Sequence, residues 1–389
     1  MARIIDAPLL SQDGGGCDTL SGVGTWGPLQ AAARRGLVYD AGVKARTDHL
    51  YEAVKDVIPA FEWPAYAPLI DAINRLKVEK NAVVLAHNYM TSEIFHCVGD
   101  FRGDSLQLAR EAAATRAQVI VQAGVHFMAE TSKILAPDKT VLIPDMRAGC
   151  SLAASITGRD VRLIKARYPG VPVVTYVNTS ADVKAESDVT CTSSNAVQVV
   201  EWAAREWGVD RVIMIPDEFL ARNVATMTDI KIIAWKGRCE VHERFTAEDV
   251  AELRQAHPGV VVLAHPECPP EVMAAADYAG STAALANYVT ERSPRKVVLL
   301  TECSMSDNVA SAAPNTEFVR PCNLCPHMKR ITLAGIHDSL VTMQHEVTVP
   351  EDVRVRAEQA INRMLALPKT VKPLDFQVGR PAADVEMFA

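Results

Sequence analysis

Reactive side chains recur in this chain of 389 residues at intervals of 86 to 89 residues, each time in the same kind of setting. Apolar strand-like runs end in an imidazole or a phenol, turns carry a hydroxyl, and each cycle contains one cysteine. A repeat that keeps strand, hydroxyl and thiol together predicts three copies of one α/β unit around a shared point. The in-phase residues are His87, Tyr176 and His265 at the strand ends, Ser105, Ser193 and Thr282 in the turns, and Cys150, Cys239 and Cys325.

The three in-phase cysteines predict a shared metal centre. A single buried cysteine is more often a small hydrophobic residue, but three at one phase favour ligation. Zinc in a structural site usually takes a fourth protein ligand, whereas a [4Fe–4S] cluster held by three thiolates leaves one iron free to bind substrate as a Lewis acid. Cys322 forms a CxxC pair with Cys325, and we interpret it as a spare thiol. The cysteines without this phase are interpreted as structural: Cys17, Cys97, Cys191, Cys268 and Cys303.

Polar groups just past the strand ends are candidates for binding and proton transfer. Open parallel sheets bind ligands at the carboxyl ends of their strands, and imidazoles, phenols and a carboxylate are suited to acid–base chemistry. One such residue often only bonds a backbone carbonyl, but three parallel sets favour a site. The residues are His87, Asn88, Tyr89, Tyr176, Asn178, His265 and Glu267.

The hydroxyls of Ser105, Ser193 and Thr282 lie in turns that open predicted helices. N-capping alone would account for any one of them. Helix N-termini also present free N–H groups and partial positive charge to anions, so three converging starts predict a cradle for carboxylate or phosphate. His126 and Glu130, four residues apart, are predicted to form a structural pair near the site, and His242 is a candidate to support the metal centre.

The elements that position these residues follow from the hydrophobic pattern. Continuous Val/Ile/Leu runs without alternation indicate parallel strands covered by helices on both faces. The sequence therefore predicts an α/β fold with three pseudo-threefold-related α/β/α sandwich domains, each with a small parallel sheet. The predicted parts are a weakly ordered extension (1–45), a helical lead-in (46–80), unit 1 (81–150), unit 2 (151–239), unit 3 (240–345) and a C-terminal helix and tail (346–389).

Charge and hydropathy exclude several classes of partner. The net charge of −7 and the absence of a long Lys/Arg run disfavour nucleic acid and anionic membranes. No stretch approaches the ~18–20 uninterrupted apolar residues of a membrane span, and no signal peptide is evident. We therefore expect a cytoplasmic protein with no membrane contact. Its nine cysteines fit reduced thiols or metal ligands better than a disulfide framework.

Nine sequence blocks, in order, resemble those of the quinolinate synthase family, iron–sulfur enzymes of NAD biosynthesis. The resemblance covers roughly residues 70–345. The blocks are AHNY (86–89), GVHFMAET (124–131), AGCSLA (148–153), YVNTSA (176–181), CTSSN (191–195), WKGRCEVHE (235–243), AHPEC (264–268), GST (280–282) and CPHMKRITL (325–333).

The resemblance implies three α/β/α domains about a pseudo-threefold axis and a [4Fe–4S] cluster held by Cys150, Cys239 and Cys325. The implied reaction condenses iminoaspartate with dihydroxyacetone phosphate to quinolinate, with loss of phosphate and two waters, and makes the enzyme that supplies iminoaspartate a further candidate partner. Proton transfer is implied for Tyr89; we add Glu267, with His87 and His265 orienting substrate. Implied substrate-binding residues are His87, Ser105, Tyr176, Asn178, Ser193, His265, Glu267 and Thr282.

Two features depart from the family pattern. Some members carry CxxCxxC before the proline, whereas the first of those positions here is Val319, and the segment before residue 70 is longer than the family core requires. Two alternative functions stay open: another hydro-lyase with an open-iron cluster, and a non-catalytic iron–sulfur sensor whose strand-end groups bind a metabolite. A sensor would not need a carboxylate and phenols beside the cluster.

Overall fold

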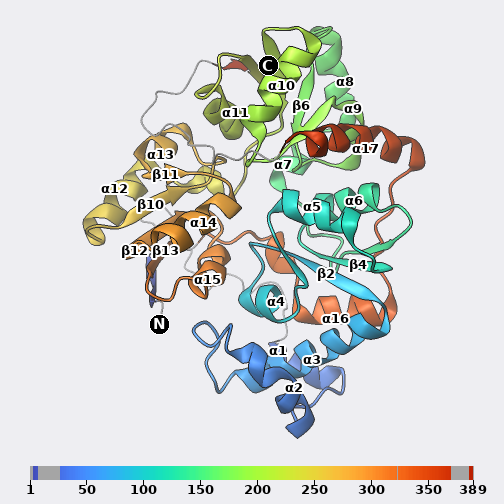
Figure 1. The fold of residues 1–389 in the computed structure, drawn as a ribbon, viewed down its shortest axis with the longest axis vertical. Helices are drawn as coiled ribbons and strands as arrows, with labels where there is room; N and C mark the ends of the chain where they lie inside the picture. The colour runs from blue at the N-terminus through green and yellow to red at the C-terminus, as the bar shows by residue number, and fades with distance from the viewer. Residues whose placement is uncertain (1–2, 8–26, 322, 369–384, 389) are drawn as a thin grey trace.

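The computed structural model describes residues 3–7, 27–321, 323–368 and 385–388. Its strands form three separate sheets in which all described strand pairs are parallel (Figure 1). The predicted α/β fold with three small parallel sheets is confirmed. Sheet 1 contains β2 (Ala82–His87), β3 (Phe101–Gly103), β4 (Val119–Ala123) and β5 (Thr140–Leu142). Sheet 2 contains β6 (Val173–Tyr176), β7 (Val189–Cys191), β8 (Arg211–Ile215), β9 (Lys231–Ala234) and β14 (Glu386–Met387). Sheet 3 contains β10 (Val261–Ala264), β11 (Tyr278–Ala279), β12 (Lys296–Leu300), β13 (Glu317–Pro321) and β1 (Arg3–Ala7).

The same strand order recurs in each sheet. The first strand of a unit lies between the second and third, and the fourth pairs with the third: β3-β2-β4-β5, β7-β6-β8-β9 and β11-β10-β12-β13. Parallel strands need crossover connections, and helices supply them. The carboxyl ends of the four strands therefore lie at one edge of each sheet, where the predicted site residues follow them.

Helices connect and cover the strands. Unit 1 has α3 (Trp63–Glu79), α4 (Ser92–Cys97), α5 (Ser105–Ala114) and α6 (His126–Leu135). Unit 2 has α7 (Ser151–Ala154), α8 (Gly158–Arg167), α9 (Ala181–Glu186), α10 (Ala196–Trp207) and α11 (Glu218–Ala225). Unit 3 has α12 (Ala247–Ala256), α13 (Pro270–Ala275), α14 (Thr282–Arg292) and α15 (Ser304–Ala310). The remainder are α1 (Pro28–Arg34), α2 (Ala41–Tyr51), α16 (Leu333–Thr342), α17 (Glu351–Ala366) and the 3-10 turns η2 (His242–Arg244) and η3 (Met328–Arg330).

The third sheet shows why its strands are apolar at successive positions. Val262 of β10 enters a core that also contains Leu253 of α12, whereas its neighbour Leu263 enters a separate core with Leu285 of α14. Both strand residues are fully buried. Because successive side chains point to opposite faces, a sheet with helices on both sides needs apolar residues at every position.

Each in-phase cysteine is followed by the same local structure. A short helical turn (α7, η2 or η3) comes next, and seven residues after the cysteine a threonine caps the following helix. Thr157 accepts a hydrogen bond from the Asp160 amide, and Thr246 accepts one from the Asp249 amide. Thr332 does the same with Gly335. Capped helix starts thus fix the loops that carry the thiols.

The strands that lead to the cysteines have their outer edges covered by segments outside the repeat. β14 pairs with β9, and β1 pairs with β13. At β5 the cover is antiparallel, since the Ile143 amide donates to the His345 carbonyl at 3.1 Å and the Val347 amide donates to the Val141 carbonyl at 2.8 Å. Covering an edge satisfies its free N–H and C=O groups.

The prediction of a weakly ordered extension over 1–45 is wrong for its described part. Pro28 starts α1, the Asp40 side chain accepts from the Val43 amide to cap α2, and Ala31 and Ala32 are buried. An alanine-rich segment packed on α3 and α16 gave no helical stripe of large apolar residues, so its sequence pattern was weak. The Gly-rich patch at 14–16 lies outside the described residues.

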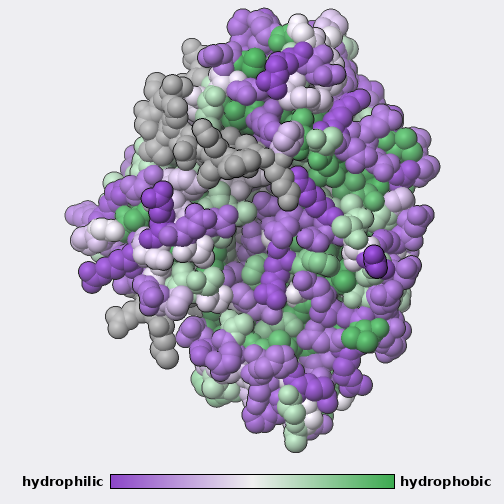
Figure 2. All heavy atoms as spheres, viewed as in Figure 1, coloured by the Kyte–Doolittle hydropathy of each residue, from purple (hydrophilic) through white to green (hydrophobic). Residues whose placement is uncertain are grey.

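The C-terminal helix α17 packs on α9 and α6. α16, within the predicted range of unit 3, packs on α3 of unit 1. Within the described part of the chain, none of the helices combines the length and apolar character that a membrane crossing requires. The face shown in Figure 2 is dominated by hydrophilic side chains.

Candidate active site

The twelve residues predicted to bind or orient substrate, transfer protons or hold the cluster all line one cavity, to which the three units each contribute side chains. The cavity contains about 730 Å³ of empty space, part of it open to solvent. The residues are His87, Tyr89, Ser105, Cys150, Tyr176, Asn178, Ser193, Cys239, His265, Glu267, Thr282 and Cys325.

The three cysteines are partly exposed residues that line the cavity. Burial raises the pKa of Cys150 to about 12 and that of Cys325 to about 11, and the pKa of Cys239 is raised further by burial and by Glu267. Backbone N–H groups of the turn that follows act in the opposite direction and lower the pKa, for example Ala153 at Cys150 and Met328 at Cys325. Such N–H donors favour the thiolate, so the donor set fits a positively charged iron–sulfur centre, which would remove the cost of ionisation.

A serine hydroxyl joins two of the cysteine loops. Ser151 Oγ donates to the Arg238 carbonyl at 3.1 Å and accepts from the Glu240 amide at 3.1 Å. These two groups flank Cys239, and Ser151 directly follows Cys150. The loops of units 1 and 2 therefore hold a fixed relation at the site.

His87 and His265 are neutral donors in this cavity. Nδ1 of each accepts a backbone N–H from two residues further on, Tyr89 at 3.2 Å and Glu267 at 3.4 Å. The ring proton must then lie on Nε2. Burial lowers the pKa of His87 to about 4 and that of His265 to about 3. Nε2 of His265 lies 3.3 Å from Ser193 Oγ.

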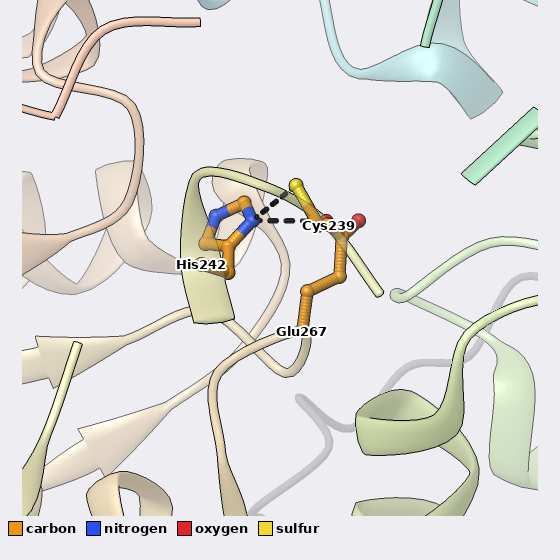
Figure 3. A group of neighbouring side chains, drawn as sticks. All are labelled: Cys239, His242 and Glu267. Atoms are coloured by element: carbon orange, nitrogen blue, oxygen red, sulfur yellow. Dashed lines mark hydrogen bonds and ion pairs between the residues drawn. The ribbon is translucent and has the colours of Figure 1, made fainter. Parts of the chain in front are cut away.

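A chain of hydrogen bonds joins the two phenols of the site across all three units. The Tyr89 hydroxyl lies 2.6 Å from Thr301 Oγ1, which lies 2.9 Å from His242 Nε2. His242 Nδ1 lies 2.9 Å from Glu267 Oε2, and Figure 3 marks this contact with a dashed line. The Tyr176 hydroxyl donates to Glu267 Oε1 at 2.5 Å. The chain provides a path for a proton between the units.

Glu267 is held as a carboxylate although it is buried. Burial acts to raise its pKa, but His242 and the Tyr176 hydroxyl lower it below the ordinary value. Burial, with the charge of Glu267, raises the pKa of Tyr176 and of Tyr89 well above their ordinary value. At neutral pH the ionised carboxylate of Glu267 therefore lies beside a protonated phenol, that of Tyr176, and is joined through His242 and Thr301 to a second, that of Tyr89.

His242 Nδ1 also lies 3.1 Å from Cys239 Sγ. The ligand atoms of Cys239, His242 and Glu267 lie within 4.8 Å of one another, close enough to share a metal ion (Figure 3). His242 thus contacts both a predicted cluster ligand and the carboxylate, as a group that supports the metal centre should.

The three hydroxyls line the cavity without capping their helices. Asp104 caps α5, Asn195 precedes α10, and Ser281 Oγ caps α14 by accepting from the Ala284 amide at 3.3 Å. The capping explanation for Ser105, Ser193 and Thr282 is therefore wrong. Thr282 Oγ1 accepts from Asn88 Nδ2 at 2.9 Å, which brings Asn88 to the site as well.

Several residues were missed by the sequence reading. Thr301 follows β12 directly, so a search of every strand end, and not only the first of each unit, would have found it. Thr192, Glu302, His327 and Met328 line the cavity, and no repeat pointed to them. The predicted pair of His126 and Glu130 is present at 3.9 Å, and Glu130 accepts from the Ala181 amide at 3.1 Å, joining α6 to α9. Cys322 lies outside the described residues.

The three α/β units bring in-phase thiols, a carboxylate and phenols to one cavity. This arrangement is that of an enzyme whose site can hold a thiolate-bound cofactor. Residues 71–366 match the family model for quinolinate synthetase A protein. The chain belongs to this family.

Its relatives are similar over most of their length. It is 63% identical over 353 residues to a quinolinate synthase of Caulobacter vibrioides, covering 90% of this chain and 96% of the relative. It is 65% identical over 318 residues to quinolinate synthase 2 of Mesorhizobium japonicum, covering 82% and 97%. A quinolinate synthase of Sinorhizobium medicae is 59% identical over 345 residues, covering 87% and 95%. The Caulobacter match is longer than the family model, so that relative shares part of the terminal segments.

Proposed function

We propose that this chain is a quinolinate synthase, which condenses iminoaspartate with dihydroxyacetone phosphate to quinolinate, phosphate and two waters in NAD biosynthesis. The single observation that carries the proposal is that one cavity of a family member is lined by the twelve residues predicted for substrate, proton transfer and cluster, drawn from all three units. Anionic substrates fit a cavity with hydroxyls and neutral imidazole donors, and the ring-closing steps need groups that move protons.

Cys150, Cys239 and Cys325 are the residues that would hold a [4Fe–4S] cluster. When bound, the cluster supplies a Lewis acid at the iron that has no cysteine ligand. Each unit contributes one of the three thiols, so the cluster can form only when all three units are folded and packed together.

The remaining residues bind substrate and move protons. Nε2–H of His87 and of His265 donates to a carboxylate or hydroxyl of the substrate without adding charge. The carboxylate of Glu267 accepts a proton, and its contacts to His242 and Tyr176 stabilise the charged form before the reaction. Tyr89 donates a proton, which Thr301 and His242 can replace through the hydrogen-bonded chain.

The substrate anions would lie against Ser105, Ser193 and Thr282. All three residues line the cavity and none of them caps its helix, so each hydroxyl can donate a hydrogen bond to an anion there. Asn178 and Tyr176 line the same cavity and add an amide and a phenol. We further propose a cytoplasmic enzyme, supported by the reduced thiols, with the enzyme that supplies unstable iminoaspartate as its partner.

Anaerobic turnover tests the function. Protein with reconstituted cluster should form quinolinate, detected by its pyridine absorbance, from dihydroxyacetone phosphate and freshly generated iminoaspartate. Glu267→Gln protein with the same cluster content is the matched control for contaminating activity. Substrate binding without turnover would favour a sensor, and hydration or dehydration of other hydroxy acids without quinolinate formation would favour a different hydro-lyase.

A further inference from the structure

A buried lysine joins two functional residues from different units. The Lys329 side chain is 9% exposed, and its Nζ donates to Glu302 Oε1 at 2.9 Å, Ser304 Oγ at 2.6 Å and the Tyr89 carbonyl at 2.8 Å. These bonds use all three protons of the ammonium group. Lys329 lies four residues after Cys325, within η3, so it belongs to a cysteine loop of unit 3 while it holds the backbone of unit 1.

Glu302 completes the connection. Its side chain is fully buried, Oε2 accepts from the Ser304 amide at 2.9 Å, and Oε1 accepts from the Cys325 amide at 3.3 Å. The ion pair between Lys329 and Glu302 therefore touches the main chain of both Tyr89 and Cys325. One is the proposed proton donor and the other a proposed cluster ligand.

The equivalent positions of the other units carry no such pair. Glu302 is the second residue after β12, and the second residues after β4 and β8 are Val125 and Asp217. Four residues after their cysteines, units 1 and 2 have Ala154 and Glu243 in place of Lys329. An ion pair that served only to stabilise an α/β unit would be expected in all three units. A buried ion pair also often gives little more stability than apolar residues in its place. The pair in unit 3 therefore has a task specific to that unit.

We propose that Lys329, paired with Glu302, is a positioning residue that fixes the Tyr89 backbone relative to the Cys325 loop. The Tyr89 hydroxyl forms a hydrogen bond with Thr301, the residue just before Glu302. Lys329 therefore fixes the Tyr89 backbone directly, and Glu302 fixes the chain next to the residue that binds the Tyr89 hydroxyl. The inference rests on the proposed function for its catalytic consequence, but not for its structural one.

The variant that tests this is Lys329→Met/Glu302→Gln. Lys329→Met alone would leave a buried, unpaired carboxylate and destabilise the fold, whereas the double variant removes both charges. Its matched control is Lys133→Met/Glu346→Gln, which removes a partly buried pair between α6 and the segment that covers β5. The control should retain the parent kcat.

We expect the Lys329→Met/Glu302→Gln variant to retain its cluster spectrum, with kcat lowered about tenfold and KM little changed, as when an interaction specific to the transition state is lost. In a Tyr89→Phe background the same two changes should lower kcat no further, because Lys329 acts through Tyr89. Effects that multiply, or an unchanged kcat, would overturn the proposal.

A readout independent of activity separates this inference from the proposed function. In cluster-free protein, amide hydrogen exchange near Tyr89 and Cys325 should accelerate in the Lys329→Met/Glu302→Gln variant and remain at the parent rate in the control. If the parent protein made no quinolinate, the proposed function would be wrong, but the hydrogen-exchange comparison would still test the positioning role. Unchanged exchange at both segments would sink the positioning role.

Discussion

The ends of β2 and β10 differ from the end of β6 in what they present to the cavity. The first ends in His87 and the second is directly followed by His265; Nδ1 of each histidine accepts a backbone N–H, so Nε2 carries the ring proton. The third ends in Tyr176, which donates to Glu267 of another unit. The repeated backbone supplies equivalent positions, and the differences between copies supply the chemistry.

The residue two places further on sharpens this comparison. It is Tyr89 in unit 1, Asn178 in unit 2 and Glu267 in unit 3. Three carboxylates at one point would repel one another and raise each other's pKa. A single carboxylate, contacted by His242 and Tyr176, can stay ionised while the phenols stay protonated. Strict threefold symmetry would therefore abolish the separation of proton donor and acceptor.

The largest expected effect comes from a feature that is equivalent in all three units, the thiol. Replacing Cys150, Cys239 or Cys325 singly with Ala should abolish the cluster, because a cluster held by only three cysteines would lose one of its three protein ligands. Parent protein purified without oxygen should contain about four irons and four sulfides per chain. Cys322→Ala is the control and should keep its iron. The reverse pattern, with iron lost from Cys322→Ala and kept in Cys325→Ala, would exchange their assignments.

The next effect breaks the asymmetry at Glu267. Glu267→Gln keeps the shape of the side chain but removes the proton-accepting carboxylate, so kcat should fall about 10²–10⁴-fold. Cluster content should match that of the parent, which anaerobic iron analysis would establish. A rate within threefold of the parent value would remove Glu267 from the mechanism.

The hydroxyls are equivalent in the three units, so each should contribute similarly to anion binding. Ser105→Ala, Ser193→Ala and Thr282→Ala should each weaken binding of quinolinate or a phosphate-bearing analogue by roughly ten- to a hundredfold, the size of a charge-assisted hydrogen bond. Calorimetric titration measures the affinity and thermal melting the stability.

Ser281→Ala is the matched control for the hydroxyl series, because Ser281 is the residue that caps α14. Loss of this cap should cost about 1 kcal/mol of stability and leave affinity unchanged. The opposite distribution, stability lost in the three site variants and affinity retained, would return those hydroxyls to a structural role.

The neutral histidines predict a dependence of stability on pH. The pKa of His87 is about 4 in the folded protein, below its unfolded value of about 6.5. The unfolded chain therefore binds a proton first, and stability falls as pH drops from about 6.5 to about 4, by roughly 3 kcal/mol for a shift of this size. His87→Gln should flatten this part of the urea-unfolding profile, whereas the exposed His49→Gln should not. An identical slope in both variants would mean that His87 is not buried neutral.

The fold and the main site residues could be predicted from the sequence because they repeat. Apolar runs such as 83–89 and 261–267 show the strand and its functional end together, and the spacing of the cysteines predicted which thiols meet. Thr301, His242 and Glu302 act through contacts between units, and no local pattern records which loop faces which. His242 was found only because it lies near Cys239.

The terminal segments were the least predictable part for a related physical reason. α1 and β14 are short and gain stability from packing on other elements, so their own sequences carry little pattern. The N-terminal strand β1 pairs with β13, where Arg3 lies opposite Glu317, and the C-terminal strand β14 pairs with β9, where Glu386 lies opposite Ile233. In both pairs the two strands are far apart in the sequence. Long-range pairing of a short edge strand leaves no periodicity to read.

The smallest expected effect tests what the cover of a cysteine-bearing strand contributes. The Phe388 amide donates to the Ala234 carbonyl at 2.9 Å, and its ring stacks on Trp235, with centroids 5.8 Å apart, just beyond β9. Trp235 in turn donates from Nε1 to the Ser155 carbonyl at 3.1 Å, in the loop after α7. Phe388→Ala should cost about 1 kcal/mol of stability through the lost aromatic pair.

The same variant should leave kcat unchanged, because Phe388 contacts the strand that leads to Cys239 and not the cavity. Hydrogen exchange should accelerate in β9 and stay at the parent rate in β5, whose edge is covered by a different segment. Equal acceleration in both strands would show general loosening instead of a local cover. Faster exchange in β9 alone would mean that the covering segment of unit 2 protects only the strand that leads to Cys239. Each unit would then hold its cysteine in place through a contact that does not recur in the other units.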